Sequence, residues 1–318
     1  MLKFGKDQTN ASSGAPHQKV FLPDLAVDPT RPEGLGAAPS PAPVARYPQL
    51  SARPVVSVVL GSFNRERLLK PAIDSVRREL AAISGEILVV DGGSTDGSIE
   101  WLLGQEDVIT IVQRNRVTID GVAMRRRSWG GFMNIAFRAA AGQYILMISD
   151  DCLLLPGTIS TALRRIEQAN AAGLRVGGCA FYFRNWPEEP AYYVQRTLGG
   201  NLMVNHGIYV REALEAVGYA DEDQYVFYKA DTDLSLKIWQ AGFHIIDSPG
   251  SICEHFLDPG EAARISNNAV MDFDRNVMRQ RWPALVSKAC VAKMGKIILD
   301  KTPGKEAQET WGPQVAKA

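Results

Sequence analysis

The chain lacks three features that would narrow its function at once: an excess of charge, a long apolar run and a cluster of cysteines. Its 35 basic and 35 acidic residues cancel, which argues against a nucleic-acid partner, because such partners select a basic face. No apolar run reaches the roughly 18–20 residues of a membrane-spanning helix, and the N-terminus has no secretory signal. The four cysteines are widely spaced without a CxxC pair, which argues against structural zinc and predicts reduced thiols in a cytoplasmic protein.

The first 53 residues differ in composition from the rest of the chain. They are rich in proline, alanine, glycine and serine and show no hydrophobic period, which predicts a disordered leader over 1–53. Apolar residues make up 46% of the whole sequence, enough for a full core after Pro54. We expect a globular domain over 54–260, a helical extension over 261–300 and a flexible tail over 301–318.

Short β-branched runs alternate with amphipathic segments from Val55 onward. We expect strands over residues 55–63, 86–93, 108–113, 143–151 and 177–183, with helices between them. Pro71 has to lie in the first turn of its helix, so that helix should begin near Leu69. The alternation predicts an α/β fold in which a mainly parallel sheet is flanked by helices.

Polar and glycine-rich stretches directly follow three of these strands. They are Gly61 to Asn64, Asp91 to Ser94 and Ser149 to Asp151. Because ligands of open α/β sheets bind beyond the carboxyl ends of the strands, we expect the three stretches to converge on one site. The glycines after Asp91 permit close approach of a ligand, and its carboxylate can accept hydrogen bonds from a base or a ribose. The alternative is an ordinary loop in which Asp96 caps the next helix.

Two adjacent carboxylates, Asp150 and Asp151, stand at the end of an apolar strand. Burying both is costly unless a positive partner joins them. A Mg²⁺ or Mn²⁺ ion prefers such oxygen ligands and leaves positions open for phosphate oxygens. The alternative is that one of the two acids caps the helix after Pro156 or hydrogen-bonds a turn. We favour the metal because the other two strand-end stretches are expected to meet the pair.

Four stretches in this order and spacing resemble family 2 inverting glycosyltransferases with the GT-A fold. They are VSVVLGSFNRERLL, EILVVDGGSTDGS, GGFMNIAFRAAAGQYILMISDD and DTDLSLKIWQAGFHI, and the resemblance covers about residues 55–255. It implies a nucleotide-binding sheet of GT-A type with a smaller acceptor-binding part, and metal-dependent, inverting transfer of a sugar. The donor would be a UDP-, dTDP- or GDP-sugar, the acceptor a hydroxyl of a glycan, lipid or small molecule, and the cofactor Mn²⁺ or Mg²⁺.

The resemblance also assigns roles to residues of the strand-end stretches. The positions that match Ser62 and Phe63 border the nucleotide in this family, and the acid that matches Asp91 contacts the base. The acids that match Asp150 and Asp151 contact the ribose and the metal. The donor site would therefore comprise Ser62, Phe63, Asn64, Asp91, Gly92 and Asp150, and the metal would lie at Asp151 and Asp150.

Three further roles follow from the same resemblance. Asp231 would be the general base, with Asp233 supporting the site or the acceptor contact. His255 matches a position that sometimes adds a metal contact. The alternatives are a helix N-cap for Asp231 and a structural histidine for His255.

The sequence departs from the family pattern at three positions. Ser149 and Ala230 stand where acids are frequent. Met278 replaces the first glutamine of the Gln-x-x-Arg-Trp segment of processive relatives, which favours non-processive transfer.

Two other functions compete with sugar transfer. A sugar nucleotidyltransferase shares the fold type but needs a glycine-rich loop with a basic residue after the first strand, a pattern that GSFNRER lacks. A non-catalytic glycan-binding relative would have no use for the four intact acids Asp91, Asp150, Asp151 and Asp231.

Three other segments have expected roles outside these motifs. Residues 184–229 are rich in aromatic and polar side chains and are expected to contact the acceptor. Arg125 to Arg127 form a basic loop that could touch a diphosphate. The lysine-rich stretch 285–300 fits either a basic amphipathic helix that docks on lipid at the inner face of the membrane or a helix packed on the globular domain.

Overall fold

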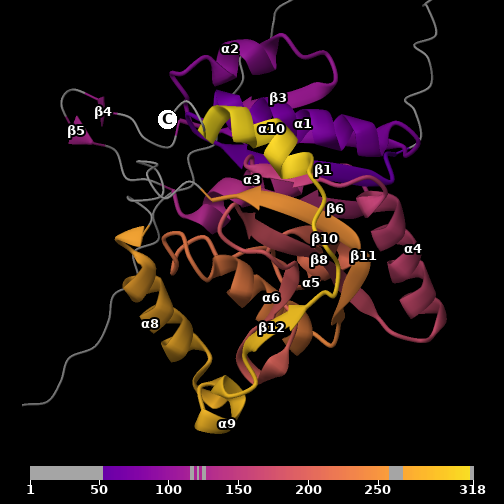
Figure 1. The fold of residues 1–318 in the computed structure, drawn as a ribbon. Coiled ribbons are helices and arrows are strands. Elements are labelled where there is room, and N and C mark those ends of the chain that lie inside the picture. Colours follow the sequence, from indigo (N-terminus) through magenta and orange to yellow (C-terminus); the bar gives the residue numbers. More distant parts are fainter. Residues whose placement is uncertain (1–52, 115–117, 120–121, 124–126, 258–267, 316–318) are drawn as a thin grey trace, which may run out of the picture. The chain divides into compact units, whose positions relative to one another are not determined.

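The computed structural model describes residues 53–114, 118–119, 122–123, 127–257 and 268–315. Within this part of the chain, strands and helices alternate through the first half (Figure 1). The elements of that half are β1 (Val56–Ser62), α1 (Glu66–Leu80), β2 (Gly85–Asp91), α2 (Ser98–Leu103), β3 (Val108–Val112), β4 (Thr118–Ile119), β5 (Val122–Ala123), α3 (Trp129–Ala139), β6 (Tyr144–Met147), β7 (Cys152–Leu154) and α4 (Thr158–Ala171). The elements that follow are β8 (Val176–Trp186), β9 (Tyr193–Arg196), η1 (Leu198–Gly200), β10 (Gly207–Val210), α5 (Arg211–Ala216), α6 (Ala230–Gln240), β11 (His244–Phe256), α8 (Met271–Arg281), η2 (Pro283–Leu285), α9 (Lys288–Val291), β12 (Gly295–Ile298) and α10 (Glu306–Val315).

One large sheet runs through the described residues in the order β12-β9-β8-β10-β6-β1-β2-β3, and β11 pairs with both β8 and β7. β1 is parallel to β2 and β6, and β2 is parallel to β3. From β10 onward the pairing is mixed, because β10 runs antiparallel to β6 and β8 while β11 runs parallel to β8. The expected α/β fold with a central, mostly parallel sheet is confirmed, and its second half is mixed.

The core forms because the central strand β1 is apolar on both faces. Val58 and Leu60 pack with Ile73 of α1 in one apolar cluster, which also includes residues of α4. Val59 points to the other face and packs with Phe137 of α3 in a second cluster. This alternation with period two covers both faces of the sheet with helices and leaves the carboxyl ends of β1 and β2 for polar loops.

Helix α1 begins earlier than Pro71 suggested. Our expected start near Leu69 is wrong, because the backbone N–H groups of Leu68 and Leu69 both donate to the Arg65 carbonyl and close a first turn from Glu66 onward. Pro71 follows inside the helix, where it removes the one backbone bond that its own N–H would donate.

The segment 285–300 forms neither of the two helices considered for it. It starts on the last residue of η2 and contains the four-residue helix α9 and then strand β12, which pairs antiparallel with β9. The β-branched residues Ile297 and Ile298 suit a strand, and the pairing of β12 with β9 adds one strand at the edge of the sheet. The expected helical extension over 261–300 is therefore only partly helical in its described residues, 268–300.

The last described segment is ordered against the domain. We expected a flexible tail over 301–318, but α10 buries Ala307 and Trp311 completely. They pack in a cluster with residues from four other elements, Leu68, Leu153, Trp186 and Phe256. The expectation is wrong because Trp311 removes a large apolar side chain from water.

The predicted leader over 1–53 lies, except for its last residue, outside the described residues. Within the described part of the chain, no helix has the length and apolar character that crossing a membrane requires.

Candidate active site

A cavity of about 440 Å³ opens beyond the carboxyl ends of β1 and β6. Strands β8, β9 and β11 and helices α3 and α6 also contribute to its wall. Of the residues that the sequence assigned to a site, Ser62, Phe63, Gly92, Asp150, Asp151, Asp231 and His255 line this cavity. The predicted residues Asn64, Asp91 and Asp233 do not line it.

The acid pair at the end of β6 is buried and held by a cation. Asp150 and Asp151 are each 2% exposed. One guanidinium nitrogen of Arg65, Nη1, lies 2.8 Å from Oδ1 of Asp150 and 3.0 Å from Oδ2 of Asp151. Burial raises the pKa of Asp150 to about 6, although the charge of Arg65 acts against that rise.

Neither acid caps the following helix. The N-terminal residue before α4 is Gly157, and the backbone N–H groups of Gly157 and Ile159 donate to the carboxylate of Glu79. Glu79 therefore satisfies the start of α4, which removes the capping alternative for Asp150 and Asp151.

The donor set around the acid pair fits a divalent cation. Oδ2 of Asp150 is buried without a hydrogen bond in the described residues, and Nε2 of His255 lies 3.4 Å from Oδ1 of Asp151. Within the described residues, Arg65 lies against both carboxylates of the pair. The described residues contain no closed cluster of three His, Cys, Asp or Glu ligands. An open set of one or two carboxylates is how Mg²⁺ is held beside substrate phosphates.

The loop after β2 is organised by its own acid. Asp91 is fully buried, and its Oδ1 accepts hydrogen bonds from the backbone N–H groups of Gly93 and Ser94 at 2.8 and 2.7 Å. Its Oδ2 accepts from the Ser94 hydroxyl at 2.7 Å. Asn64 joins this loop to the one after β1, because its N–H donates to the Ser94 hydroxyl and its Oδ1 accepts from Thr95. Asp91 and Asn64 thus shape the wall from which Gly92 lines the cavity.

Asp231 reaches the cavity from the first turn of α6. The residue before the helix is Lys229, in the left-handed conformation with φ of 69°, so Asp231 is not the N-cap. Its Oδ1 accepts from the backbone N–H of Thr232 at 2.7 Å, and its Oδ2 accepts from Nδ2 of Asn205 at 3.3 Å. Burial raises the pKa of this carboxyl against the opposing charge of Lys229, which favours proton uptake.

Asp233 performs a different task, on the other side of α6. It is fully buried, and its Oδ1 accepts from Nε1 of Trp282 and lies 2.8 Å from Nε of Arg281. The Tyr225 hydroxyl donates to the same oxygen at 3.2 Å. These contacts fasten the end of α8 to the helix that carries Asp231.

Several cavity residues escaped the sequence-based assignment. Arg65 directly follows the predicted stretch Gly61 to Asn64, and this position was the available signal for it. Asn205 and His206 lie in the segment 184–229, which was expected to contact the acceptor without single residues being named. The same segment also contributes Asn185, Tyr193, Gln195, Phe227 and Tyr228 to the lining. Arg127 lines the cavity, whereas Arg125 and Arg126 lie outside the described residues.

Comparison with known proteins points to one family. The model of glycosyl transferase family 2 matches residues 57–214. A curated relative from Nostoc, the uncharacterized glycosyltransferase alr2836, is 28% identical over 120 residues, which are 37% of this chain and 35% of the relative. The chain spans less than half the length of each curated relative compared.

Two solved structures share the fold. The Pyrobaculum calidifontis mannosyltransferase PcManGT, in complex with GDP-Man and Mn²⁺, superposes with a TM-score of 0.51 at 18% identity, over 87% of this chain and 80% of that one. The S. aureus TarS fragment 1-349 in complex with UDP-GlcNAc gives a TM-score of 0.50 at 18% identity, over 71% and 64%. At this level of identity the likeness is one of fold.

Proposed function

Because the chain belongs to glycosyl transferase family 2 and has the GT-A fold, we propose that it catalyses metal-dependent, inverting transfer of a sugar from a nucleotide-sugar donor to an acceptor hydroxyl. The observation that carries the proposal is that one cavity is lined both by the acid pair Asp150 and Asp151 and by Asp231, whose pKa is raised. The acid pair suits binding of a cation and a diphosphate, and Asp231 suits accepting a proton.

The donor would bind with its diphosphate beside the acid pair. Asp150, Asp151 and His255 would hold Mn²⁺ or Mg²⁺, which when bound neutralises the charge that develops on the departing nucleoside diphosphate. Ser62, Phe63 and the backbone of Gly92 line the same part of the cavity and would border the nucleotide.

Asp231 would act as the general base. Its carboxylate takes the proton of the acceptor hydroxyl while that oxygen forms a bond to the anomeric carbon. The bond from the anomeric carbon to the phosphate oxygen breaks on the opposite face, and its electron pair leaves with the nucleoside diphosphate. A single displacement of this kind inverts the anomeric configuration. Burial supports the role, because a base with a raised pKa holds the transferred proton more firmly.

For the donor we propose a class of compounds rather than one particular sugar. The fold neighbours carry GDP-Man and UDP-GlcNAc, so a UDP-, dTDP- or GDP-sugar is the class to test for this chain. Non-processive transfer is supported at position 278, where Met278 is buried in an apolar cluster with Tyr225 and Leu236.

The test begins with a panel of nucleotide sugars, screened by thermal shift with Mn²⁺ to identify the donor. With that donor, Asp231→Asn should lower the transfer rate by about 10²–10⁴-fold, because the amide cannot accept the proton. Donor affinity should stay close to that of the wild type. The readout is product formation together with the stereochemistry at the anomeric carbon.

Asp223→Asn is the matched control, because Asp223 is an exposed acid near the same helix and should leave the rate unchanged. A folded Asp231→Asn variant with a normal rate would refute the base assignment. Retained anomeric configuration would refute the single displacement, and undiminished turnover in excess chelator would refute the metal.

A further inference from the structure

A hydrogen-bonded chain of side chains leads from His255 away from the cavity. His255 on β11 and Asn185 on β8 are register partners in the sheet, and Nδ1 of His255 lies 2.6 Å from Oδ1 of Asn185. Nδ2 of Asn185 donates to Oε2 of Glu189 at 2.6 Å and to the Tyr193 hydroxyl at 3.0 Å. Nζ of Lys296 on β12 donates to Oε1 of Glu189 at 2.6 Å.

Glu189 determines which group donates and which accepts in each hydrogen bond of this network. An ionised carboxylate only accepts hydrogen bonds. Burial raises the pKa of Glu189, but hydrogen bonds from Lys296, from Tyr193 and from the backbone of Asn185 outweigh it and keep the pKa below its usual range. Glu189 therefore requires the NH₂ end of the Asn185 amide to face it, and the carbonyl end is left to face His255.

The consequence reaches the imidazole ring. Oδ1 of Asn185 is an acceptor without a proton, so Nδ1 of His255 must be the donor in their 2.6 Å contact. A neutral ring with its proton on Nδ1 has a free electron pair on Nε2. That nitrogen is the one 3.4 Å from Oδ1 of Asp151. The network thus directs a lone pair toward the acid pair.

We propose that Asn185 is a positioning residue that selects the Nδ1–H tautomer of His255, and that Glu189 and Lys296 hold Asn185 in the orientation needed for it. The metal-binding consequence rests on the proposed function, because it assumes that His255 and Asp151 share a divalent ion. A partner that accepts from the remote nitrogen of a histidine both orients the ring and raises its basicity as a ligand.

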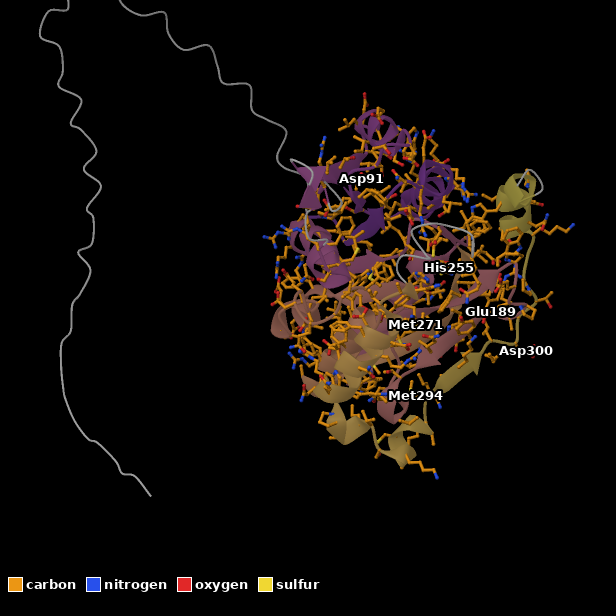
Figure 2. All side chains as sticks on the ribbon, turned by 90° about the vertical axis from the view of Figure 1, so that its left-hand side faces the viewer. Asp91, Glu189, His255, Met271, Met294 and Asp300 are labelled. Carbon is orange, nitrogen blue, oxygen red and sulfur yellow. The ribbon has the colours of Figure 1, made fainter. Side chains whose placement is uncertain are left out.

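The proposal also gives strand β12 a role. Figure 2 labels Glu189 and His255, and the hydrogen bonds through Asn185 connect them. Met294 and Asp300, labelled in the same view, flank β12, whose Lys296 stacks 3.7 Å from the ring centroid of Tyr193. Strand β12, which is far from β8 and β11 in the sequence, thereby supports a residue beside Asp151.

The experiment uses the full-length protein and two readouts. Long-range ¹H–¹⁵N spectra of the metal-free protein, recorded at a pH alkaline enough for a neutral imidazole ring, report which ring nitrogen of His255 carries the proton. Calorimetry reports Mn²⁺ binding. We expect the Nδ1–H tautomer in the wild type and its loss in Asn185→Leu. Mn²⁺ affinity should fall by about 10–100-fold in that variant, the usual effect of removing such a partner. Lys296→Met should change both readouts in the same direction by less.

Two further variants separate positioning from folding. In the double variant Asn185→Asp with Glu189→Gln, residue 189 becomes the donor and residue 185 the acceptor. The net charge of the pair is kept, and residue 185 still offers an acceptor to Nδ1 of His255. The double variant should therefore restore the tautomer and the Mn²⁺ affinity. Lys288→Met, at an exposed lysine outside the network, should change neither. Thermal melts establish that each variant is folded.

Three results would overturn the proposal: an Nε2–H tautomer in the wild type, an unchanged tautomer in Asn185→Leu, or no rescue by the double variant. If the wild type binds no Mn²⁺, the metal part of the proposed function fails on that ground. The tautomer spectra then still decide the role of Asn185.

Discussion

The two sides of the cavity compensate their buried acids in different ways. After β1 and β6, Asp150 and Asp151 share the guanidinium of Arg65. On α6, Asp231 accepts hydrogen bonds from neutral groups, the backbone N–H of Thr232 and the amide of Asn205. Burial raises the pKa of Asp150 and of Asp231 alike. What differs in the described residues is the direct contact, which is a guanidinium for the acid pair and neutral donors for Asp231. The first arrangement suits binding, and the second suits taking up a proton.

Helix α10 packs against elements that flank the acid pair, which gives the largest expected effect. Trp311 of α10 packs with Leu68 of α1 and with Trp186 and Phe256 of β8 and β11. Trp311→Ala should lower the free energy of unfolding by about 3–5 kcal/mol, because it removes a large side chain from a filled site. Urea unfolding followed by tryptophan-independent circular dichroism measures the change.

Trp311→Phe serves as the control, because it keeps an aromatic ring against Trp186 and should cost clearly less. An unfolding midpoint unchanged by Trp311→Ala would mean that α10 does not stabilise the elements that flank the acid pair.

Replacing Arg65 tests how the charges of Asp150 and Asp151 are compensated. Arg65→Met removes the guanidinium that contacts both Asp150 and Asp151. This should cost about 3 kcal/mol, the lower end for a buried ion pair because Arg65 is partly exposed. Excess Mn²⁺ should recover part of this loss, because an ion that binds only the folded protein stabilises it by mass action. Urea unfolding with and without Mn²⁺ measures both effects.

Arg78→Met is the matched control, because Arg78 is an exposed arginine of α1, the helix that Arg65 precedes, and its loss should stay within about 0.5 kcal/mol. Equal losses for the two variants would mean that Arg65 does not compensate the acid pair. The difference between the two sides of the cavity would then have no basis in charge.

The site residues that the strand pattern predicted stand at or directly after the ends of strands. Ser62, Gly92, Asp150 and Asp151 each stand at or just after the end of an apolar run, and parallel pairing brings those ends together. The alternation of short strands and helices also predicted the α/β fold, because both periods are local properties of the sequence.

The rest of the site depends on pairing between distant segments. Asn185 meets His255 only because β8 and β11 pair in one particular register. Neither residue carries a local pattern that specifies its partner. The same holds for Trp311, which sits in a polar, glycine- and proline-containing stretch and is ordered by a cluster drawn from four other elements. Local composition indicated a flexible tail, and tertiary packing overrode it.

The smallest expected effect concerns the protonation of Asp150. Burial raises its pKa from 3.8 to about 6, with Arg65 acting against the rise. An acid whose pKa is higher in the folded than in the unfolded state binds its proton more tightly when folded. Its contribution to the free energy of unfolding therefore falls as the pH rises from about 4 to about 6, and it is constant above that window. The fall should not exceed about 3 kcal/mol.

Asp150→Asn should remove this pH dependence, because the amide does not titrate. The measurement is urea unfolding of both proteins between about pH 4 and pH 7, without metal. Subtracting the two free energies of unfolding removes the contributions of all other titrating groups, which the two proteins share. That difference should favour the wild type most at the acid end of the range and should shrink as the pH approaches 6. A difference that stays constant across the range would mean that Arg65 already holds Asp150 ionised at pH 4. The acid pair would then be an ion-paired cation site at every pH tested, and the contrast with Asp231 would be sharper than the pKa of Asp150 implies.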